Sequence, residues 1–288
     1  MVARRRRWGL VFAAPGAIFF AAFAFYPLID AFVVSLERWN LLLPPVYAGL
    51  QNYVLVFTDP TFWQALLNTV IFLAGTYIPA NVLGLLLAAL LNARFPLRGL
   101  YRTLFFIPAV TSQVVAAVMW LLIYNENGPV NAVLADLGIP AIPWLFSNWA
   151  MPAIILMTVW ASIGYFAVLY LAGLQSVSED VLEAASIDGA GPLQRFLRVT
   201  IPLLRNTVTF CLITSVVQGL TVFIPEMMLT NGGPNNDTMV LSLMVYNDGF
   251  VYLNMGKAAA IAVVIFVLAM GATLFSLRRI LLGSRAAA

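Results

Sequence analysis

Two apolar stretches of the chain carry polar side chains at helical spacing, and these side chains have the most chemistry to offer. They are Thr158, Ser162 and Tyr165 in the first stretch and Thr214, Ser215, Gln218 and Thr221 in the second. Residues three or four apart lie on one face of a helix. Hydroxyl and amide groups near an aromatic ring, here Trp160, are suited to hydrogen-bonding an uncharged polyol. Because a Ser or Thr hydroxyl can also bond its own helix backbone, the residues alone leave both interpretations open.

The composition excludes several other kinds of chemistry. The chain has no histidine and a single cysteine, Cys211, so it lacks the usual ligands of haem and zinc and the commonest acid-base group. It also lacks the GxxxxGK[ST] pattern, without which it cannot hydrolyse ATP by P-loop chemistry. We therefore predict that the chain is not an enzyme and holds no catalytic residue, no metal site and no cofactor.

A second candidate site is the short polar segment at residues 178–202. Ser178, followed by two acidic residues, is a typical N-cap for a helix, which Gly189 then ends. Pro192 suits the first turn of a second helix, and Pro202 ends its pattern. The segment therefore predicts two short helices joined by a turn.

The second of these helices has an apolar face formed by Leu193, Phe196 and Leu197. Such a face on a short exposed segment needs cover, either from the chain's own helices or from the groove of a partner. In the first helix, Ala184 and Ala185 beside Glu183 would allow a partner to approach closely. The pattern leaves the two kinds of cover equally open.

The elements that must position these residues are membrane helices. Hydrophobic residues make up 62% of the 288 residues and charged residues only 9%, against about 25% charged in a soluble domain. A helix of about 20 apolar residues crosses a bilayer core. We therefore predict an all-α polytopic membrane protein with six transmembrane helices, at residues 9–35, 64–91, 104–124, 151–174, 207–229 and 258–281. They would form one transmembrane domain (9–281) with a loop at 175–205, an amino end at 1–8 and a tail at 282–288.

The basic residues predict how these helices are oriented. Of the 15 basic residues, all but Arg38 and Lys257 fall on one side: Arg4 to Arg7, Arg94, Arg98, Arg102, Arg195, Arg198, Arg205, Arg278, Arg279 and Arg285. The positive-inside rule places that side, and both termini, in the cytoplasm. Because the charges are dispersed over the ends of helices, they do not indicate nucleic-acid binding.

The first apolar run could be mistaken for a secretory signal, because Ala22-Phe23-Ala24 has the spacing of a cleavage site. The run continues well past that triplet, which is too long for a signal peptide. We interpret it as an uncleaved anchor.

Other residues predict how the helices pack and where they end. Six glycines within the runs would permit close helix contact: Gly75, Gly84, Gly164, Gly173, Gly219 and Gly271. Asp30 and Glu226 fall near the predicted outer ends, where partial hydration would tolerate a charge, and we interpret them as capping or gating residues. Residues 239–246 follow a Gly-Gly-Pro turn and predict a helix lying on the outer surface.

The segment EAASIDGAG followed by VTIP resembles the EAA loop of inner-membrane permease subunits of binding-protein-dependent ABC importers. Glu183, Ala184, Ala185, Gly189 and Pro202 match the family pattern, with Val199 and Ile201 as conservative departures. Further segments resemble the carbohydrate-uptake branch: GLQNY at 49–53, DPTFWQALLNT at 59–69, RTLFFIPA at 102–109, LAGLQSV at 171–177 and LTNGGPNN at 229–236. The resemblance therefore covers most of the chain and implies the type I permease fold.

The resemblance also implies partners and roles. In that family the EAA loop sits in a cleft of the ATP-hydrolysing subunit, which implies coupling roles for Glu183, Ala184, Ala185, Asp188 and Gly189. Alignment with the larger membrane subunit of the similar maltose importer implies sugar contacts at Ser162, Tyr165, Ser215, Gln218 and Gly219. The implied partners are a second, homologous permease subunit, two ATP-binding subunits that hold the ATP and Mg, an external solute-binding protein, a sugar and the lipid bilayer of the bacterial inner membrane.

Three alternatives to sugar import remain distinct. An ion-coupled secondary transporter of a small polar solute would need buried ionisable residues at mid-membrane and usually internal repeats, and neither is evident in the sequence. An intramembrane enzyme would need a catalytic constellation that cannot be assembled without histidine. Within the family, glycerol phosphate is a further substrate class, which the few basic residues of the outer loops disfavour.

Overall fold

The computed structural model describes residues 12–93 and 96–285, with the side chains of residues 277 and 279–285 excepted. Arg4 to Arg7, Arg94 and the end of the tail lie outside the described residues. The chain divides into two compact units. Unit 1 consists of Met1–Phe62 with Met244–Phe266, and unit 2 of Trp63–Leu243 with Val267–Ala288.

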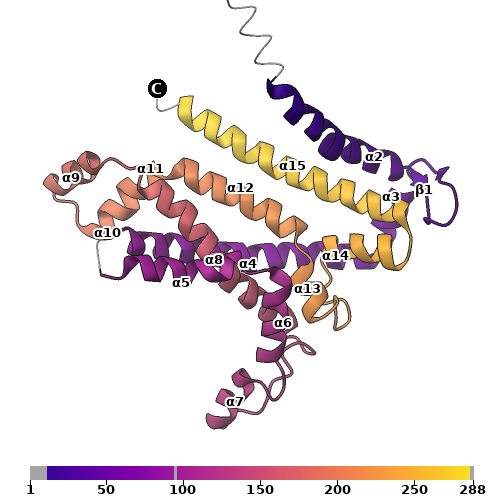
Figure 1. Cartoon of the computed structure of the whole chain (residues 1–288), viewed down its shortest axis with the longest axis horizontal. Coiled ribbons are helices and arrows are strands. Elements are labelled where there is room, and N and C mark those ends of the chain that lie inside the picture. Colours follow the sequence, from indigo (N-terminus) through magenta and orange to yellow (C-terminus); the bar gives the residue numbers. More distant parts are fainter. Residues whose placement is uncertain (1–11, 94–95, 286–288) are drawn as a thin grey trace, which may run out of the picture. The chain divides into compact units, whose positions relative to one another are not determined.

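The architecture is helical, which confirms the predicted all-α class (Figure 1). In the described residues, strands are limited to one antiparallel pair, β1 (Glu37–Arg38) and β2 (Val46–Tyr47). Among the described residues, five helices are each long and apolar enough to cross a membrane: Phe12–Val34, Pro60–Asn92, Ala150–Leu174, Arg205–Leu229 and Met255–Ser276. They coincide with five of the six predicted runs. The first contains η1 (Ala21–Phe25) and α2 (Tyr26–Val34).

The third predicted run is broken in the middle. Instead of one span over residues 104–124, the chain forms α5 (Arg98–Val110) and α6 (Gln113–Ile123), which meet at 96°. The residues between them, Thr111 and Ser112, have extended backbone. Pro108 lies in the last turn of α5 and cannot donate a backbone hydrogen bond, while the hydroxyl of Thr111 donates to the Ile107 carbonyl at 2.9 Å. The third predicted run is therefore a sharply bent pair and not one straight helix, and taken together as one span the pair completes the six that were predicted.

The fifth run contains a second break, between α12 (Arg205–Thr221) and α13 (Ile224–Leu229). A proline ring clashes with the carbonyl four residues earlier in a helix. For Pro225 that residue is Thr221, which is the last residue of α12. The position of the proline therefore accounts for the end of the helix.

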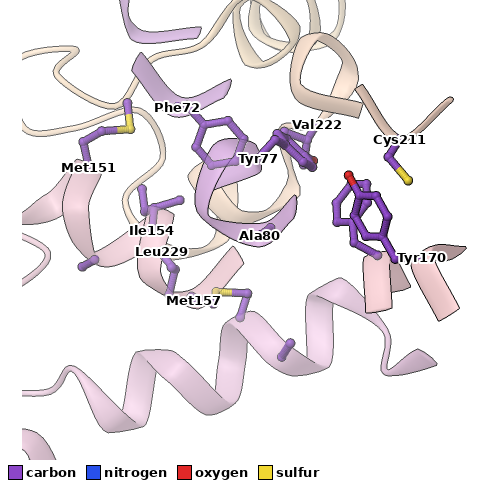
Figure 2. Packing of buried hydrophobic residues seen from close by; sticks show 14 of the residues in the cluster. Phe72, Tyr77, Ala80, Met151, Ile154, Met157, Tyr170, Cys211, Val222 and Leu229 are labelled. Carbon is purple, nitrogen blue, oxygen red and sulfur yellow. The ribbon is translucent and has the colours of Figure 1, made fainter. Parts of the chain in front are cut away.

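The core of unit 2 is built around α8 (Ala150–Leu174), whose residues meet those of α4 (Pro60–Asn92) and α12. Figure 2 shows Phe72, Tyr77, Met157 and other members of this buried cluster together. A polar contact crosses the same core, because the amide of Asn81 donates to the Ser215 hydroxyl at 2.8 Å and accepts from the Tyr170 hydroxyl at 2.8 Å. This hydrogen-bonded group ties α4, α8 and α12 together.

Glycines allow these helices to approach closely, as predicted, at five of the six positions. A β-carbon added at Gly164 of α8 would lie 2.1 Å from the Phe105 carbonyl oxygen of α5, and one at Gly84 would lie 2.8 Å from the β-carbon of Phe166. Similar contacts surround Gly75, Gly173 and Gly219. Gly271 is the exception, since nothing lies within 4 Å of its added β-carbon.

The helix after the Gly-Gly-Pro turn, α14 (Leu241–Tyr246), does not lie on an outer surface. Leu241 and Leu243 are fully buried. Within unit 2, the Leu241 backbone N–H donates to the Thr69 hydroxyl at 2.9 Å, and the Asn68 amide donates to the Met239 carbonyl at 3.0 Å. The apolar pattern reflects burial against α4, and the surface prediction is wrong.

Unit 1 is held together by an ion triad at the start of α15 (Met255–Arg285). The ammonium of Lys257 lies 2.9 Å from the Asp59 carboxylate and 3.3 Å from that of Asp248 in η3 (Asn247–Val251). Burial alone would raise the pKa of Asp59, but the hydrogen bond from Lys257 brings it below its usual value. At Asp248 burial outweighs the same cation, and its pKa is raised.

The remaining elements are short. In unit 1, α3 (Gln51–Thr58) includes Asn52, whose amide donates to the carbonyls of Ser35 and Glu37 at 2.9 and 2.8 Å. In unit 2, α7 (Pro129–Asp136) includes Asn131, whose side-chain oxygen accepts from the Trp144 indole at 3.0 Å.

We predict that Gly164→Ala destabilises the protein, because the added methyl group would collide with the backbone of Phe105, which cannot rotate away. Overpacking of this kind costs about 1–3 kcal/mol. Thermal unfolding in detergent, followed by tryptophan fluorescence, should show a lower midpoint for this variant. Gly271→Ala is the matched control, since it adds the same methyl group into open space; equal midpoints for the two variants would contradict the close α5 to α8 contact.

Candidate functional site

The main candidate site is a cavity of about 430 Å³ in unit 2, located where both helix breaks meet α8. The break between α5 and α6 contributes Pro108, Thr111 and Gln113 to its wall, and the break between α12 and α13 contributes Val222 and Pro225. Its other lining residues are Tyr77, Ala109, Ala116, Met157, Thr158, Ala161, Ser162, Tyr165, Gln218 and Thr221. The ends of a helix leave backbone carbonyl and N–H groups without intrahelical partners, so four helix ends make this wall unusually polar for a membrane interior.

The polar side chains of the wall fall into two groups. The hydroxyls of Thr158 and Thr221 donate to the carbonyls four residues before them, at 2.8 Å in both cases. These two hydroxyls therefore bond the backbone of their own helix and not a ligand. The side chains of Ser162, Tyr165 and Gln218 make no hydrogen bond to any other described residue, and all three residues are half-buried in the wall. They are therefore available to a ligand.

Two of the five residues implied to contact sugar do not line the cavity. Ser215 is buried, donates to the Cys211 carbonyl at 2.7 Å and accepts from Asn81. Gly219 packs so closely on Leu73 of α4 that an added β-carbon would lie 2.8 Å from its side chain. In this structure both residues serve contacts between helices. Trp160 also lies outside the lining and stacks edge-to-face on Trp120 at 5.7 Å.

None of the described residues that line the cavity is charged, but a charged residue is buried next to it. Glu226 follows the lining residue Pro225, is fully buried, and neither of its carboxylate oxygens has a hydrogen-bond partner among the described residues. The Tyr77 phenol of the cavity wall lies within electrostatic range of this carboxyl group. The expectation that Glu226 is partly hydrated near an outer helix end is therefore wrong. Asp30, in contrast, is exposed on α2.

Sequence reasoning missed the contribution of the third run to this wall. Thr111, Ser112 and Gln113 form a polar triplet inside an otherwise apolar run, and that interruption is the signal that could have located the break. Tyr77 had no such signal, because its neighbours in the sequence are those of an ordinary apolar helix. Only the packing of α4 brings it to the cavity.

The second candidate site is a helical hairpin formed by α9 (Glu179–Ile187), α10 (Pro192–Arg195), η2 (Phe196–Thr200) and α11 (Ile201–Leu203). As predicted, the Ser178 hydroxyl caps α9 by accepting from the Asp180 N–H at 3.3 Å, and Pro192 lies in the first turn of α10. Gly189 has a φ of +82°, which favours glycine. Pro202 starts the short α11 instead of ending the pattern, because the helix stops two residues later at Leu204.

The hairpin presents an uncovered surface. Glu183, Ala184, Asp188 and Gly189 are exposed and Ala185 is half-buried. The hairpin is braced internally, because the Arg195 guanidinium donates to the Ser186 hydroxyl at 2.7 Å. Phe196 of the predicted apolar face is half-buried, but other apolar side chains are left open, with exposed fractions of 87% for Ile187, 70% for Leu193 and 52% for Leu197. The other helices in the described part of the chain therefore do not cover these side chains.

Comparison with known proteins identifies a family that shares this architecture. The family described as "Binding-protein-dependent transport system inner membrane component" matches residues 80–284. The chain is 35% identical over 277 residues to the sulfoquinovosyl glycerol transport system permease protein SmoG of Agrobacterium fabrum, covering 95% of this chain and 90% of that protein. It is 36% identical over 267 residues to the lactose transport system permease protein LacF of Rhizobium radiobacter, covering 90% and 89%.

The fold has solved counterparts as well. A chain of the crystal structure of a bacterial alginate ABC transporter, in complex with an alginate pentasaccharide-bound periplasmic protein, superposes with a TM-score of 0.80 at 24% identity. The match covers 94% of this chain and 93% of that one. The type I permease fold implied by the EAA resemblance is therefore confirmed.

We predict that replacing Glu226 by methionine stabilises the protein. A buried carboxyl group without hydrogen bonds carries a desolvation penalty of about 1–3 kcal/mol, which an apolar side chain of similar length removes. The midpoint of thermal unfolding in detergent should rise for Glu226→Met and stay unchanged for Glu126→Met, whose carboxylate is exposed. A lower midpoint for Glu226→Met would show that the carboxyl group has a partner that stabilises the fold.

Proposed function

Because the chain belongs to the family of binding-protein-dependent transport system inner membrane components, we propose that it is the permease subunit of an ATP-driven importer of uncharged sugars, such as di- or oligosaccharides. In this proposal the chain forms half of the translocation pathway. A second, homologous permease subunit forms the other half, and an external solute-binding protein delivers the sugar.

The observation that carries the substrate class is the neutral, hydrogen-bonding wall of the cavity. Ser162, Tyr165 and Gln218 offer free hydroxyl and amide groups, and the lining contains no charged side chain. Sugar hydroxyls both donate and accept hydrogen bonds, and an aromatic ring such as Tyr165 can cover the apolar face of a pyranose. A glycerol phosphate would lack a cation in this wall. The relative named for lactose transport supports an uncharged glycoside.

The proposal assigns energy coupling to the helical hairpin. The chain carries no P-loop pattern, so ATP and Mg belong to two separate ATP-binding subunits, and this chain is not an enzyme. Ile187, Leu193 and Leu197 would enter a groove of an ATP-binding subunit, with Glu183, Ala184, Ala185, Asp188 and Gly189 at the contact. This requires the hairpin and both termini on the cytoplasmic side of the bacterial inner membrane. No role for nucleic acid follows from any of these features.

One observation favours ion-coupled transport as the alternative. Such a carrier needs a buried ionisable residue within the membrane, and Glu226 is one. Uptake into proteoliposomes separates the two functions, because an ATP-driven importer stops on ATP depletion whereas an ion-coupled carrier stops on addition of an ionophore.

We predict that the free polar groups of the cavity are required for transport and the satisfied ones are not. The sugar is first identified by calorimetry of the cognate binding protein against a panel of disaccharides and oligosaccharides. Gln218→Leu or Ser162→Ala should then lower uptake about tenfold, the effect of one or two lost hydrogen bonds. Thr158→Val is the control, since that hydroxyl is already bonded to its own helix; an equal loss in all three variants would count against the assignment.

We predict that Gly189→Val disrupts assembly with the ATP-binding subunits, because a β-branched residue resists a φ of +82° and would add bulk at the contact. The amount of ATP-binding subunit that co-purifies should fall at least about tenfold. Gly138→Val is a matched control: its φ is +75° and its added β-carbon also meets nothing within 4 Å, but it lies outside the hairpin. Unchanged co-purification and transport with Gly189→Val would refute the coupling role.

A further inference from the structure

A separate groove with a cation in its lining lies on unit 2, and it shares no lining residue with the cavity or the hairpin. Arg102 of α5 is partly buried, and two of its guanidinium nitrogens, Nε and Nη2, are covered. Neither nitrogen has a hydrogen-bond partner among the described residues, and the side chain forms no ion pair with them. Leaving a buried charged donor unpaired is costly. The third nitrogen, Nη1, is not among the covered atoms.

The groove beside Arg102 has a volume of about 300 Å³ and an apolar wall. Its lining includes Phe105 and Phe106 of α5, Val168 and Leu171 of α8, and Leu91 of α4. Phe105, Phe106 and Val168 are between 37% and 47% exposed. This is a long apolar surface with a single cation at its rim.

The order of these residues along the helices matches the depth profile of a membrane. Arg102 lies about one turn from the start of α5, and Leu171 lies about one turn from the end of α8, where each turn rises about 5.4 Å. Phe105, Phe106 and Val168 lie further from those ends. If these are the cytoplasmic ends, as the proposed function requires, the cation lies at the level of the lipid headgroups and the apolar wall lies at the level of the acyl chains.

We propose that this groove binds an anionic phospholipid of the inner leaflet. The headgroup phosphate accepts a hydrogen bond from Nη1 of Arg102 and lies beside the charge of its guanidinium, and one acyl chain fills the wall between α5 and α8. Arg98, four residues earlier and therefore on the same face of α5, adds positive charge at the rim, and the groove lining contains no carboxylate. A free phosphate would satisfy the cation and leave the apolar wall uncovered, so an amphipathic ligand fits both features.

The test uses the full chain, purified without the ATP-binding subunits and stripped of lipid in detergent. Binding of phosphatidylglycerol and of phosphatidylcholine is measured by native mass spectrometry and by the thermal unfolding midpoint. We expect at least about a tenfold preference for phosphatidylglycerol, as one charge-assisted pair supplies. Equal binding of both lipids would overturn the proposal, and so would an equal shift of the midpoint by millimolar inorganic phosphate.

Variants separate the charge from the wall. Arg102→Gln should abolish the preference, Arg102→Lys should retain part of it, and Val168→Trp should block the acyl-chain seat and weaken binding of both lipids. Arg198→Gln removes an exposed arginine of the hairpin and should leave the preference unchanged. If Arg102→Gln does not fold, Val168→Trp alone decides: full lipid binding by that variant overturns the proposal. Because the assay involves no transport, its outcome is independent of whether the importer function holds.

Discussion

The structure depends on one constraint, which is that a backbone polar group within a bilayer must find a partner inside the protein. A continuous helix meets this constraint at every residue, and most of the apolar runs of this chain are continuous. The two breaks, at residues 111–112 and 222–223, are therefore exceptions that need a local explanation. Both border the same cavity. Non-helical backbone is tolerated within a bilayer where it lines a cavity. The breaks also bring polar residues such as Thr111 and Gln113 into the wall of this cavity.

Close helix packing near the breaks supports the cavity wall. Gly164 lets α8 approach the backbone of α5 just before its end, and Gly219 lets α12 approach α4 just before the second break. The Asn81, Ser215 and Tyr170 group adds hydrogen bonds among α4, α8 and α12. These contacts hold the cavity wall in place from behind, which is why Ser215 and Gly219 belong to the support of the site and Ser162, Tyr165 and Gln218 to its surface.

The charged side chains lie apart from the surface of the cavity. The cavity wall carries no charged side chain among the described residues, while the Lys257 triad lies in unit 1, Arg102 lies in the separate groove and Glu226 is buried next to the wall. A neutral wall suits a solute that is recognised by its hydroxyls and must also be released. The exposed hairpin contributes little to the stability of the chain itself, since its apolar side chains are uncovered. The proposed contact with an ATP-binding subunit would cover these side chains.

The amino-acid sequence by itself determined the helical class, the location of the apolar runs, the two-helix hairpin with its Ser178 cap, and the family, because periodicity, capping and the EAA pattern are local properties of the chain. The tertiary structure alone decided that α14 is buried, that Glu226 is enclosed and that Tyr77 reaches the cavity. It also decided which hydroxyls are free, since Thr158 and Ser162 look alike in sequence. The physical reason is that exposure and hydrogen bonding at each of these positions are set by residues distant in the chain, and a local pattern carries no record of them.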